Sequence, residues 1–360
     1  MESLKDPIKA QSNALFDLLQ EYRRTGYGRD RGSDGVTSIE EYRRAFPILN
    51  YYGFHPMVRR ALIGDYSYLC SDKPVTYVMT RGTTGEPKVI PCTPAHLDKI
   101  FECGARAIIN EALRAEDLSL VEGYVLNLNF PSEVFEVVGA DGTIKYGYSS
   151  GTYARLKPTL GLGGLVPPQE RIDSLGPGIK VEDWNRRFEM VYQETRDLPV
   201  VAVMGVTPVI LSFANYVRRR HGHSPRDLWR MKVLFCTSVA KIQSEYGPQV
   251  QRLFGQAPVR EIYSATEGVF AQQLDEYPYV VPNFDSYFFE VKIRNRVKML
   301  HEMKRGEWGR LVVSTPILPR YDIGDMIECL GSYYYRVFGR AKPLVVLEHV
   351  LYRIVTGWAT

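Results

Sequence analysis

The chain has 360 residues, of which 45% are hydrophobic and 24% charged, and its formal net charge is +4. This composition is typical of a globular protein of one large or two ordinary domains, and no run of about twenty apolar residues indicates a membrane-spanning helix. The charge is too small to indicate a nucleic-acid-binding protein by itself.

The N-terminal part is predicted to be helical. Leucines at helical spacing predict a first helix over residues 11–24, and a Gly/Asp/Arg loop is expected at 26–35. A second helix is expected to begin at Ser38, a good N-cap, with Glu40 and Glu41 in its first turn.

The next element is a short buried strand, residues 75–79, which leads into TRGTTGEPK at 80–88. Glycines allow backbone N–H groups to approach a ligand closely, hydroxyls donate to phosphate oxygens, and a lysine supplies positive charge. The loop therefore predicts a polyphosphate site, although a plain surface turn remains the alternative for the loop alone. The spacing is not that of a Walker A loop, and the glycines at 161–164, followed by two prolines, do not form a Rossmann fingerprint.

Short apolar runs alternate with helical patterns through the middle of the chain. Strands are predicted at residues 121–130, 200–204, 232–237 and 259–263, and helices at 182–196 and 244–254. A long Gly/Pro-rich connection is expected at 143–177, and an antiparallel section at 287–313. Alternating strands and helices predict an α/β fold with helices on both faces of a sheet.

The five cysteines are dispersed without a CxxC pair, which is typical of a reducing cytoplasm. A cleavable apolar leader is not recognisable, so a cytoplasmic protein is expected. Cys92, His96 and Cys103 do not have the spacing of a zinc site, and structural roles are favoured for them.

Three later clusters supply groups that a nucleotide site needs. IYSATEG at 262–268 offers the Tyr263 ring for adenine, the Thr266 hydroxyl for a phosphate and the Glu267 carboxylate for Mg²⁺. RYDIGDM at 320–326 places Asp325 after a glycine, at an expected strand end, where it can accept hydrogen bonds from two ribose hydroxyls. VFGRAK at 337–342 is expected to be a strand that breaks at Gly339 and presents Arg340. Each cluster alone is also compatible with an ordinary turn or strand end.

The order of the four clusters resembles the core motifs of the ANL superfamily of adenylating enzymes: acyl-CoA synthetases, peptide-synthetase adenylation domains and luciferases. The loop at 80–88 resembles [ST]SGTTGxPK, the cluster at 262–268 resembles YGxTE, Asp325 resembles the aspartate of [YR]xTGD, and Gly339-Arg340 resembles the GRxD hinge. The GH3-like and phenylacetate-CoA-ligase-like branch is the most similar, over about residues 8–342.

The resemblance implies an adenylate-forming N-terminal-type domain over 1–342, with mixed sheets sandwiched by helices and a smaller antiparallel section near 287–340. It also implies a short tail at 343–360 in place of the family's mobile C-terminal domain. Arg81 and Ser264 depart from the usual Ser and Gly of the motifs, and Asp322 stands where Arg is usual. The chain also resembles, in its length and in where it stops, a short member of the family from phenazine antibiotic biosynthesis, in the pathway to D-alanylgriseoluteic acid. That resemblance implies an aromatic, phenazine-type carboxylic acid as substrate.

The implied reaction is activation of that acid by MgATP to an acyl-adenylate with release of pyrophosphate. The implied catalytic residues are Lys88, Thr266 and Glu267, with Glu267 also holding Mg²⁺. The implied nucleotide-binding residues are Thr80, Arg81, Gly82, Thr83, Thr84, Gly85, Tyr263, Ser264, Asp325 and Arg340. The acid is expected between residues 205–206 and aromatic residues of the middle third.

Two alternatives remain open: a nucleotide- or aryl-acid-binding protein without turnover, and a subunit whose pathway partner supplies the missing domain. A homodimer is also compatible with the sequence, whereas nucleic acid and membrane partners are not expected.

Overall fold

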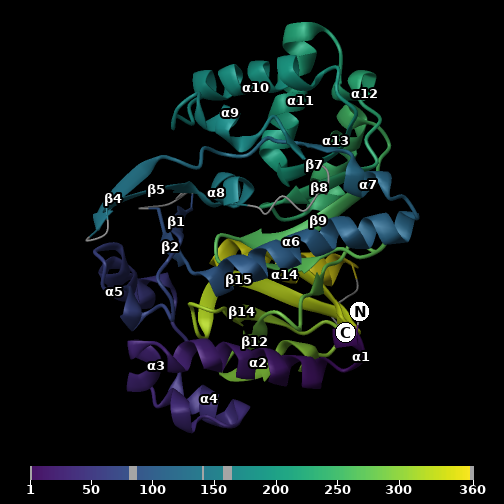
Figure 1. Ribbon diagram of the computed structural model, residues 1–360. Helices are drawn as coiled ribbons and strands as arrows, with labels where there is room; N and C mark the ends of the chain where they lie inside the picture. The colour runs from purple at the N-terminus through teal and green to yellow at the C-terminus, as the bar shows by residue number, and fades with distance from the viewer. Residues whose placement is uncertain (1, 81–86, 140–141, 157–163, 357–360) are drawn as a thin grey trace. The chain divides into compact units, whose positions relative to one another are not determined.

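The computed structural model describes residues 2–80, 87–139, 142–156 and 164–356, and its chain divides into two compact units. One unit comprises Met1–Val75, Thr93–His96 and Tyr279–Thr360, and the other comprises Thr76–Cys92 and Leu97–Pro278. Both contain sheets covered by helices, so the predicted mixed α/β fold is confirmed (Figure 1). Within the described ranges, no helix combines the length and the apolar character that crossing a bilayer requires.

The unit of residues 76–278 is built around a mainly parallel sheet in the order β10-β9-β8-β7-β3-β6. Strands β9, β8, β7, β3 and β6 run parallel, and β10 is antiparallel to β9. The strands of this sheet are β3 (Tyr124–Leu126), β6 (Leu165–Val166), β7 (Val200–Val206), β8 (Val233–Thr237), β9 (Val259–Ala265) and β10 (Gly268–Gln272).

Helices cover both faces of this sheet (Figure 1). One face carries a core in which Val203, Leu234 and Val259 pack with apolar residues of α10, α11 and α13, and the other packs against α6 and α7. Burial on both faces explains why these strands read as continuous apolar runs. The helices of this unit are α6 (Pro94–Ala115), α7 (Ser119–Glu122), α8 (Ser149–Leu156), α9 (Gln169–Asp173), α10 (Val181–Thr195), α11 (Thr207–His221), α12 (Pro225–Leu228) and α13 (Gly247–Phe254).

A second, four-stranded sheet of the same unit carries the phosphate-loop motif. Its order is β2-β1-β5-β4, with β1 (Thr76–Met79), β2 (Val89–Cys92), β4 (Phe135–Gly139) and β5 (Gly142–Tyr148). Strand β1 is buried along its whole length, pairs antiparallel with β2 and runs parallel to β5. The buried strand predicted before the loop is therefore confirmed.

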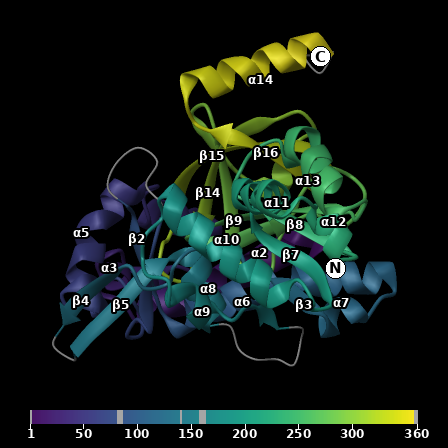
Figure 2. The same ribbon diagram turned by 90° about the horizontal axis from the view of Figure 1, so that it is seen from above.

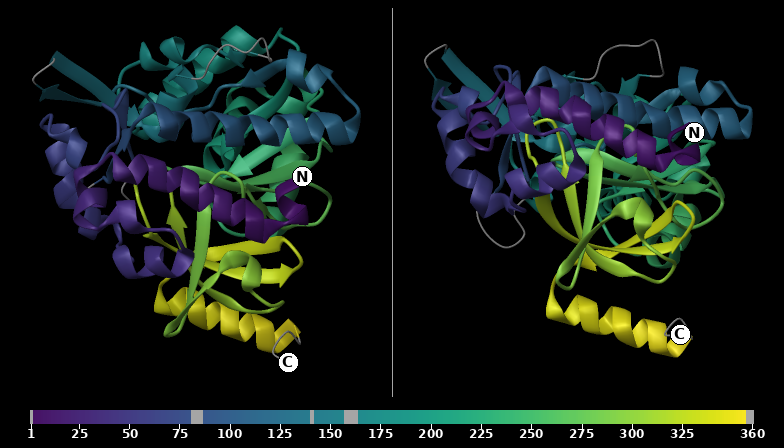
Figure 3. Two further views of the ribbon diagram at one scale, coloured as in Figure 1. Left: turned by 60° about the horizontal axis from the view of Figure 1, so that its bottom comes forward. Right: turned by 90° about the horizontal axis from the view of Figure 1, so that it is seen from below.

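The other unit combines N-terminal helices with an antiparallel sheet in the order β13-β12-β14-β15-β16. The predicted antiparallel section is thus confirmed, and Figure 3 shows α2 and α14 on opposite sides of this sheet. The strands of this unit are β11 (Val281–Pro282), β12 (Phe288–Ile293), β13 (Arg296–Met299), β14 (Trp308–Ser314), β15 (Tyr321–Gly331) and β16 (Tyr334–Arg340). The helices are α1 (Glu2–Lys5), α2 (Pro7–Arg23), α3 (Gly26–Asp30), α4 (Ile39–Ala45), α5 (Tyr51–Leu62) and α14 (Pro343–Thr356).

Side-chain caps explain where the N-terminal helices begin. The Asp6 side chain accepts a hydrogen bond from Lys9 N, and Pro7 takes the first helical position, where its missing N–H is harmless. The predicted cap at Ser38 is confirmed, because its hydroxyl accepts from Glu41 N. The C-terminal helix α14 lies over β15 and β16 (Figure 2), where the His349 ring stacks on Phe338 at 3.7 Å.

Several predicted boundaries are wrong for local reasons. The loop expected at 26–35 contains α3, because Thr25 caps a helix there by accepting a hydrogen bond from Gly28 N. The strand expected at 121–130 is only β3, since the Asn127 side chain turns the chain by accepting from Asn129 N.

Two further segments also differ from prediction. The connection expected at 143–177 instead contains β5, α8, β6 and α9. The helix expected at 244–254 begins earlier as a π-helical segment, Ile242–Tyr246, and continues as α13.

Candidate active site at the strand ends of residues 76–278

The two ends of the predicted phosphate loop are tied together across β1 and β2. Thr80 N donates to Lys88 O at 2.9 Å, and Lys88 N donates to the Thr80 hydroxyl at 3.0 Å. These bonds continue the ladder by one residue beyond Met79–Val89, so Thr80 and Lys88 leave the sheet side by side. The loop residues between them that the motif singled out lie outside the described residues: Arg81, Gly82, Thr83, Thr84 and Gly85.

The second predicted cluster forms a tight turn at the carboxyl end of β9. Ala265 pairs with Gly268, so Thr266 and Glu267 are the two turn residues between β9 and β10. Both are largely buried. Ligands of open α/β sheets bind at the carboxyl ends of the strands, which is where this turn lies.

Helix α8 holds that turn in place. The Tyr153 hydroxyl donates to the Thr266 carbonyl at 2.7 Å, and the Thr266 hydroxyl donates to Ser149 Oγ at 3.4 Å. The sequence did not single out Tyr153 or Ser149 as site residues, because their segment was expected to be a connection. The helix over residues 149–156, which begins at Ser149, is the feature of this segment that could have indicated these two residues.

The loop end and the turn meet in an ion pair. Lys88 Nζ lies 3.9 Å from Glu267 Oε1, and the lysine side chain is 31% exposed whereas the glutamate is 3% exposed. A buried carboxylate and a partly exposed ammonium are thus close in space, although they come from motifs 179 positions apart in sequence. The structure therefore brings together two of the three predicted catalytic residues, and Thr266 adjoins them.

Ser264 and Tyr263 lie on the same strand just before the turn. Ser264 Oγ and Thr237 Oγ1, on the neighbouring strand end, are 2.9 Å apart, and Thr207 at the start of α11 donates to the Thr237 carbonyl at 2.9 Å. The Tyr263 ring is partly exposed, and its centroid lies 5.8 Å from that of Phe270. The tyrosine thus has an aromatic neighbour tilted by 46° and keeps contact with solvent, which leaves the ring accessible to an adenine.

Asp325 and Arg340 belong to the other unit, where the structure corrects their predicted setting. Asp325 is not at a strand end: it lies within β15, directly across from Arg340 on β16. Strand β16 also does not break at Gly339 but continues to Arg340, because Gly339 adopts a φ of +140° that glycine tolerates. Arg340 Nε lies 3.1 Å from Asp325 Oδ1, so a ribose bound there would share this carboxylate with the arginine.

A single carboxylate at the turn fits magnesium only as a nucleotide complex. Among the described residues no group of three or more His, Cys, Asp or Glu side chains gathers to hold a metal ion. Mg²⁺ commonly takes one or two protein carboxylates and completes its shell with phosphate oxygens and water. Glu267 is thus suited to hold magnesium that arrives with ATP.

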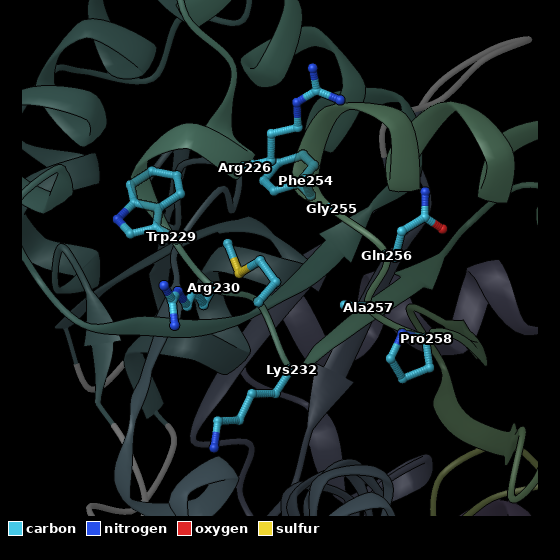
Figure 4. Close-up of a pocket in the computed structure, with 10 residues that line it drawn as sticks. Arg226, Trp229, Arg230, Lys232, Phe254, Gly255, Gln256, Ala257 and Pro258 are labelled. Carbon is cyan, nitrogen blue, oxygen red and sulfur yellow. The ribbon is translucent and has the colours of Figure 1, made fainter.

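A depression of about 440 Å³ lies elsewhere in the same unit (Figure 4). Arg226, Trp229 and Lys232 line it from the segment that enters β8, and Pro258 from the segment that enters β9. It therefore lies at the amino ends of these parallel strands, opposite the Thr266–Glu267 turn. Because of this position the depression is separate from the candidate active site.

Removing the Tyr153 hydroxyl is expected to loosen the turn. Tyr153→Phe deletes the donor to the Thr266 carbonyl, and a lost hydrogen bond of this kind costs about 1 kcal/mol of stability. Urea denaturation would measure this loss of stability. The rate of acid-dependent ATP–pyrophosphate exchange should also fall several-fold, because the turn that carries Thr266 and Glu267 loses a support. Unchanged stability and activity would show that α8 does not position the turn.

Glu261, two residues before Tyr263, is a further residue that the sequence did not single out as a site residue. Burial raises the pKa of its carboxyl from 4.5 to about 7. A carboxyl whose pKa is raised in the folded protein contributes stability at low pH that is lost as the pH rises from about 4.5 through 7.

Glu261→Gln, which cannot ionise, is therefore expected to gain stability over the wild type as the pH rises. We expect little difference at pH 4.5 and a gain of about 1–3 kcal/mol at pH 8. Thermal denaturation at several pH values measures it, with the exposed Glu245→Gln as a control that should show no such trend. An equal effect at all pH values would contradict the raised pKa.

Comparison with known proteins shows which proteins the chain is similar to in sequence and in fold. Residues 1–175 match the model described as the GH3 family N-terminal domain. The jasmonoyl–L-amino acid synthetase JAR4 of Nicotiana attenuata is 26% identical over 137 residues, which are 38% of this chain and 23% of that protein. The indole-3-acetic acid-amido synthetase GH3.2 of Arabidopsis thaliana is 28% identical over 100 residues, which are 27% of this chain and 18% of that protein. The matched region thus spans less than a quarter of the length of these relatives.

Solved structures show the same fold over most of the chain. The GH3.15 acyl acid amido synthetase in complex with 2,4-DB superimposes with a TM-score of 0.73 at 16% identity, covering 94% of this chain and 68% of that one. The 2-hydroxyisobutyryl-CoA ligase in complex with 2-HIB-AMP and CoA gives a TM-score of 0.60 at 16% identity, covering 89% and 70%. The chain therefore carries a match to the GH3 family N-terminal domain in residues 1–175 and has the fold of the acyl acid amido synthetases and acyl-CoA ligases.

Proposed function

We propose that the protein is an adenylate-forming ligase that activates an aromatic carboxylic acid with MgATP. The observation that carries the proposal is the meeting of Lys88 and Glu267 beside Thr266, at the carboxyl end of β9. A cation from a Gly/Thr loop and a carboxylate from a strand-end turn are the complementary groups that a magnesium-bound polyphosphate needs.

In the proposed reaction a carboxylate oxygen of the acid attacks the α-phosphorus of ATP. The bond from the α-phosphorus to the oxygen that bridges to the β-phosphate breaks, and pyrophosphate leaves with the bonding electrons. A carboxylate is already nucleophilic, so the protein supplies position and charge, not a general base. Products are the acyl-adenylate and pyrophosphate.

Each residue then has a defined task. Lys88, with Thr80, Thr83, Thr84 and Arg81 of the loop, would neutralise and hold the departing pyrophosphate. Glu267 would bind the magnesium, which supplies further charge neutralisation at the phosphates, and Thr266 would contact the α-phosphate. Tyr263 would carry the adenine ring, with Ser264 beside it, and Asp325 and Arg340 would serve the ribose side.

The finer proposal names the acid as a phenazine-type carboxylic acid and the setting as antibiotic biosynthesis. Its support is the resemblance of the chain to short adenylating proteins of such pathways. The relatives named above act on other acids, so the acid has to be established by assay. The acceptor that takes the acyl group from the adenylate is not part of this proposal.

Acid-dependent ATP–pyrophosphate exchange tests the proposal. A panel of aromatic acids that includes phenazine carboxylic acids should yield at least one that drives exchange well above the acid-free rate. Stabilisation by ATP without exchange for any acid would instead indicate a binding protein. Exchange that appears only after a second pathway protein is added would indicate a subunit of a larger enzyme.

A further inference from the structure

A row of three residues crosses the central sheet next to the candidate site. In the strand register Gly205 of β7 pairs with Cys236 of β8, and Cys236 pairs with Glu261 of β9. Neighbours in register share one face of a sheet. Two residues earlier, Val203, Leu234 and Val259 form the corresponding row on the face that packs against α10, α11 and α13. The Gly205–Cys236–Glu261 row therefore borders this core on its carboxyl-end side.

Space remains above Gly205. The residue is buried, yet a Cβ placed on it would meet no heavy atom of the described residues within 4 Å. Its φ is not in the left-handed region, so the backbone does not require glycine here. Since protein interiors are otherwise close-packed, a buried glycine with open space over it leaves room for part of a ligand.

Glu261 stands at the end of this row without a protein partner. No described residue makes a hydrogen bond or ion pair with its carboxylate. Its backbone is engaged by Gln273, whose side-chain oxygen accepts from Glu261 N at 3.0 Å and whose backbone N–H donates to the Glu261 carbonyl at 2.8 Å. Buried glutamates elsewhere in the described residues have cationic partners, for example Glu111 with Arg260 and Glu290 with Arg320. The contrast matters because a buried carboxyl without a partner is costly unless a ligand supplies one.

The groups around Glu261 are small and weakly polar. The Cys236 thiol lies beside it: burial raises the pKa of that thiol, and the Glu261 charge raises it further. The Thr207 hydroxyl, at the first residue of α11, lies next to the thiol. Glu261 also keeps part of its surface accessible, as expected for a side chain that borders an open space.

We propose that Glu261 determines substrate specificity by hydrogen bonding an N–H or O–H donor on the body of the acyl acid, which lies over Gly205. This inference rests on the proposed function, since it assigns the acid to the space beside the adenylating site. The acid would extend from its carboxylate, near Thr266, along β9 past Tyr263 to Glu261. The preferred acids are then flat aromatic acids with an amino, ring N–H or hydroxyl group remote from the carboxylate.

The test compares acids that differ only in the donor. Indole-carboxylic acid and its benzofuran analogue form one pair, and 4-aminobenzoate and 4-methylbenzoate form a second. We expect the wild-type enzyme to favour the donor acid of at least one pair roughly 10- to 100-fold, in both kcat/KM for exchange and equilibrium Kd, because hydrogen bonds to charged groups have this strength.

Two variants separate this role from a structural one. Glu261→Leu should reduce the preference to within about three-fold while it improves binding of the apolar acid. Gly205→Ala should weaken binding of both acids and leave ATP binding unchanged, since its Cβ enters empty space and not a packed neighbour. Glu245→Gln, an exposed glutamate paired with Lys241, is the matched control and should behave as wild type.

The proposal is overturned if the wild type shows no donor preference in binding, or if Glu261→Leu keeps it. Failure of the proposed function gives a different pattern: no acid supports exchange. In that case the Kd values still decide whether Glu261 selects the donor acid.

Discussion

Replacing Lys88 by alanine is expected to slow acid-dependent ATP–pyrophosphate exchange by about 10²–10³-fold. The ammonium lies at the loop end, beside the buried Glu267 carboxylate. In the proposed reaction, charge develops there on the departing pyrophosphate. Contacts of this kind act mainly in the transition state, so kcat should fall more than the Kd for ATP rises. Initial exchange rates over a range of ATP concentrations measure both effects.

Lys145→Ala provides a matched control for that substitution. Lys145 is an exposed lysine that has its own carboxylate partner, Glu133, at 3.3 Å. Its removal should leave exchange at the wild-type rate. If the Lys88→Ala variant kept the wild-type kcat, the assignment of Lys88 to the active site would be wrong.

Glu267→Gln should cost about 10² in exchange rate and should shift the dependence on magnesium. The amide keeps the size of the side chain but lacks the negative charge that would hold the metal in the proposed function. Raising the Mg²⁺ concentration should therefore recover part of the lost rate in this variant, whereas the wild type should already be saturated. Titrations of rate against Mg²⁺ at fixed ATP measure the shift.

Glu276→Gln is the control for the magnesium experiment. Glu276 is exposed, pairs with Arg260 at 3.0 Å and lies outside both motifs. Identical magnesium curves for Glu267→Gln and the wild type would show that Glu267 does not bind the metal. A Glu267→Gln protein that fails to fold would be recognised by its lost thermal transition.

Much of the sheet that carries the site could be predicted from the sequence. Strands β1, β7, β8 and β9 are buried apolar runs bounded by turn residues, and burial on both faces makes such runs easy to recognise. Thr80 follows directly after β1, Lys88 directly precedes β2, and Thr266 and Glu267 follow β9. Lys88 and Glu267, which come from two different motifs, lie 3.9 Å apart in the structure.

Contacts between distant segments could not be read from local patterns. The support of the turn by Tyr153 joins residues 113 positions apart, and neither residue's neighbours in sequence indicate it. In the sequence Glu261 directly follows Arg260 in a strand that reads VREIYSA, which is also what a paired or exposed glutamate looks like. That the Glu261 carboxylate lies beside an open space follows only from the register of β8 and β9 and from the space over Gly205.

The prediction that Asp325 lies at a strand end was wrong for a related reason. A glycine before an aspartate predicts a turn, and Gly324 does adopt a positive φ of +84°. Pairing with β16 nevertheless carries the strand through this residue, so the turn signal becomes an irregularity within β15. Local preference for a turn was overridden by the sheet.

Transfer of oxygen-18 from the acid to AMP tests the central claim most directly. An aromatic acid that supports exchange is labelled in both carboxylate oxygens and turned over with MgATP, and the AMP released from the adenylate is examined by mass spectrometry. The account predicts one labelled oxygen in the phosphate of AMP, because a carboxylate oxygen attacks the α-phosphorus and stays there when the acyl group departs. Label in inorganic phosphate together with ADP, or AMP without label, would contradict acyl-adenylate formation.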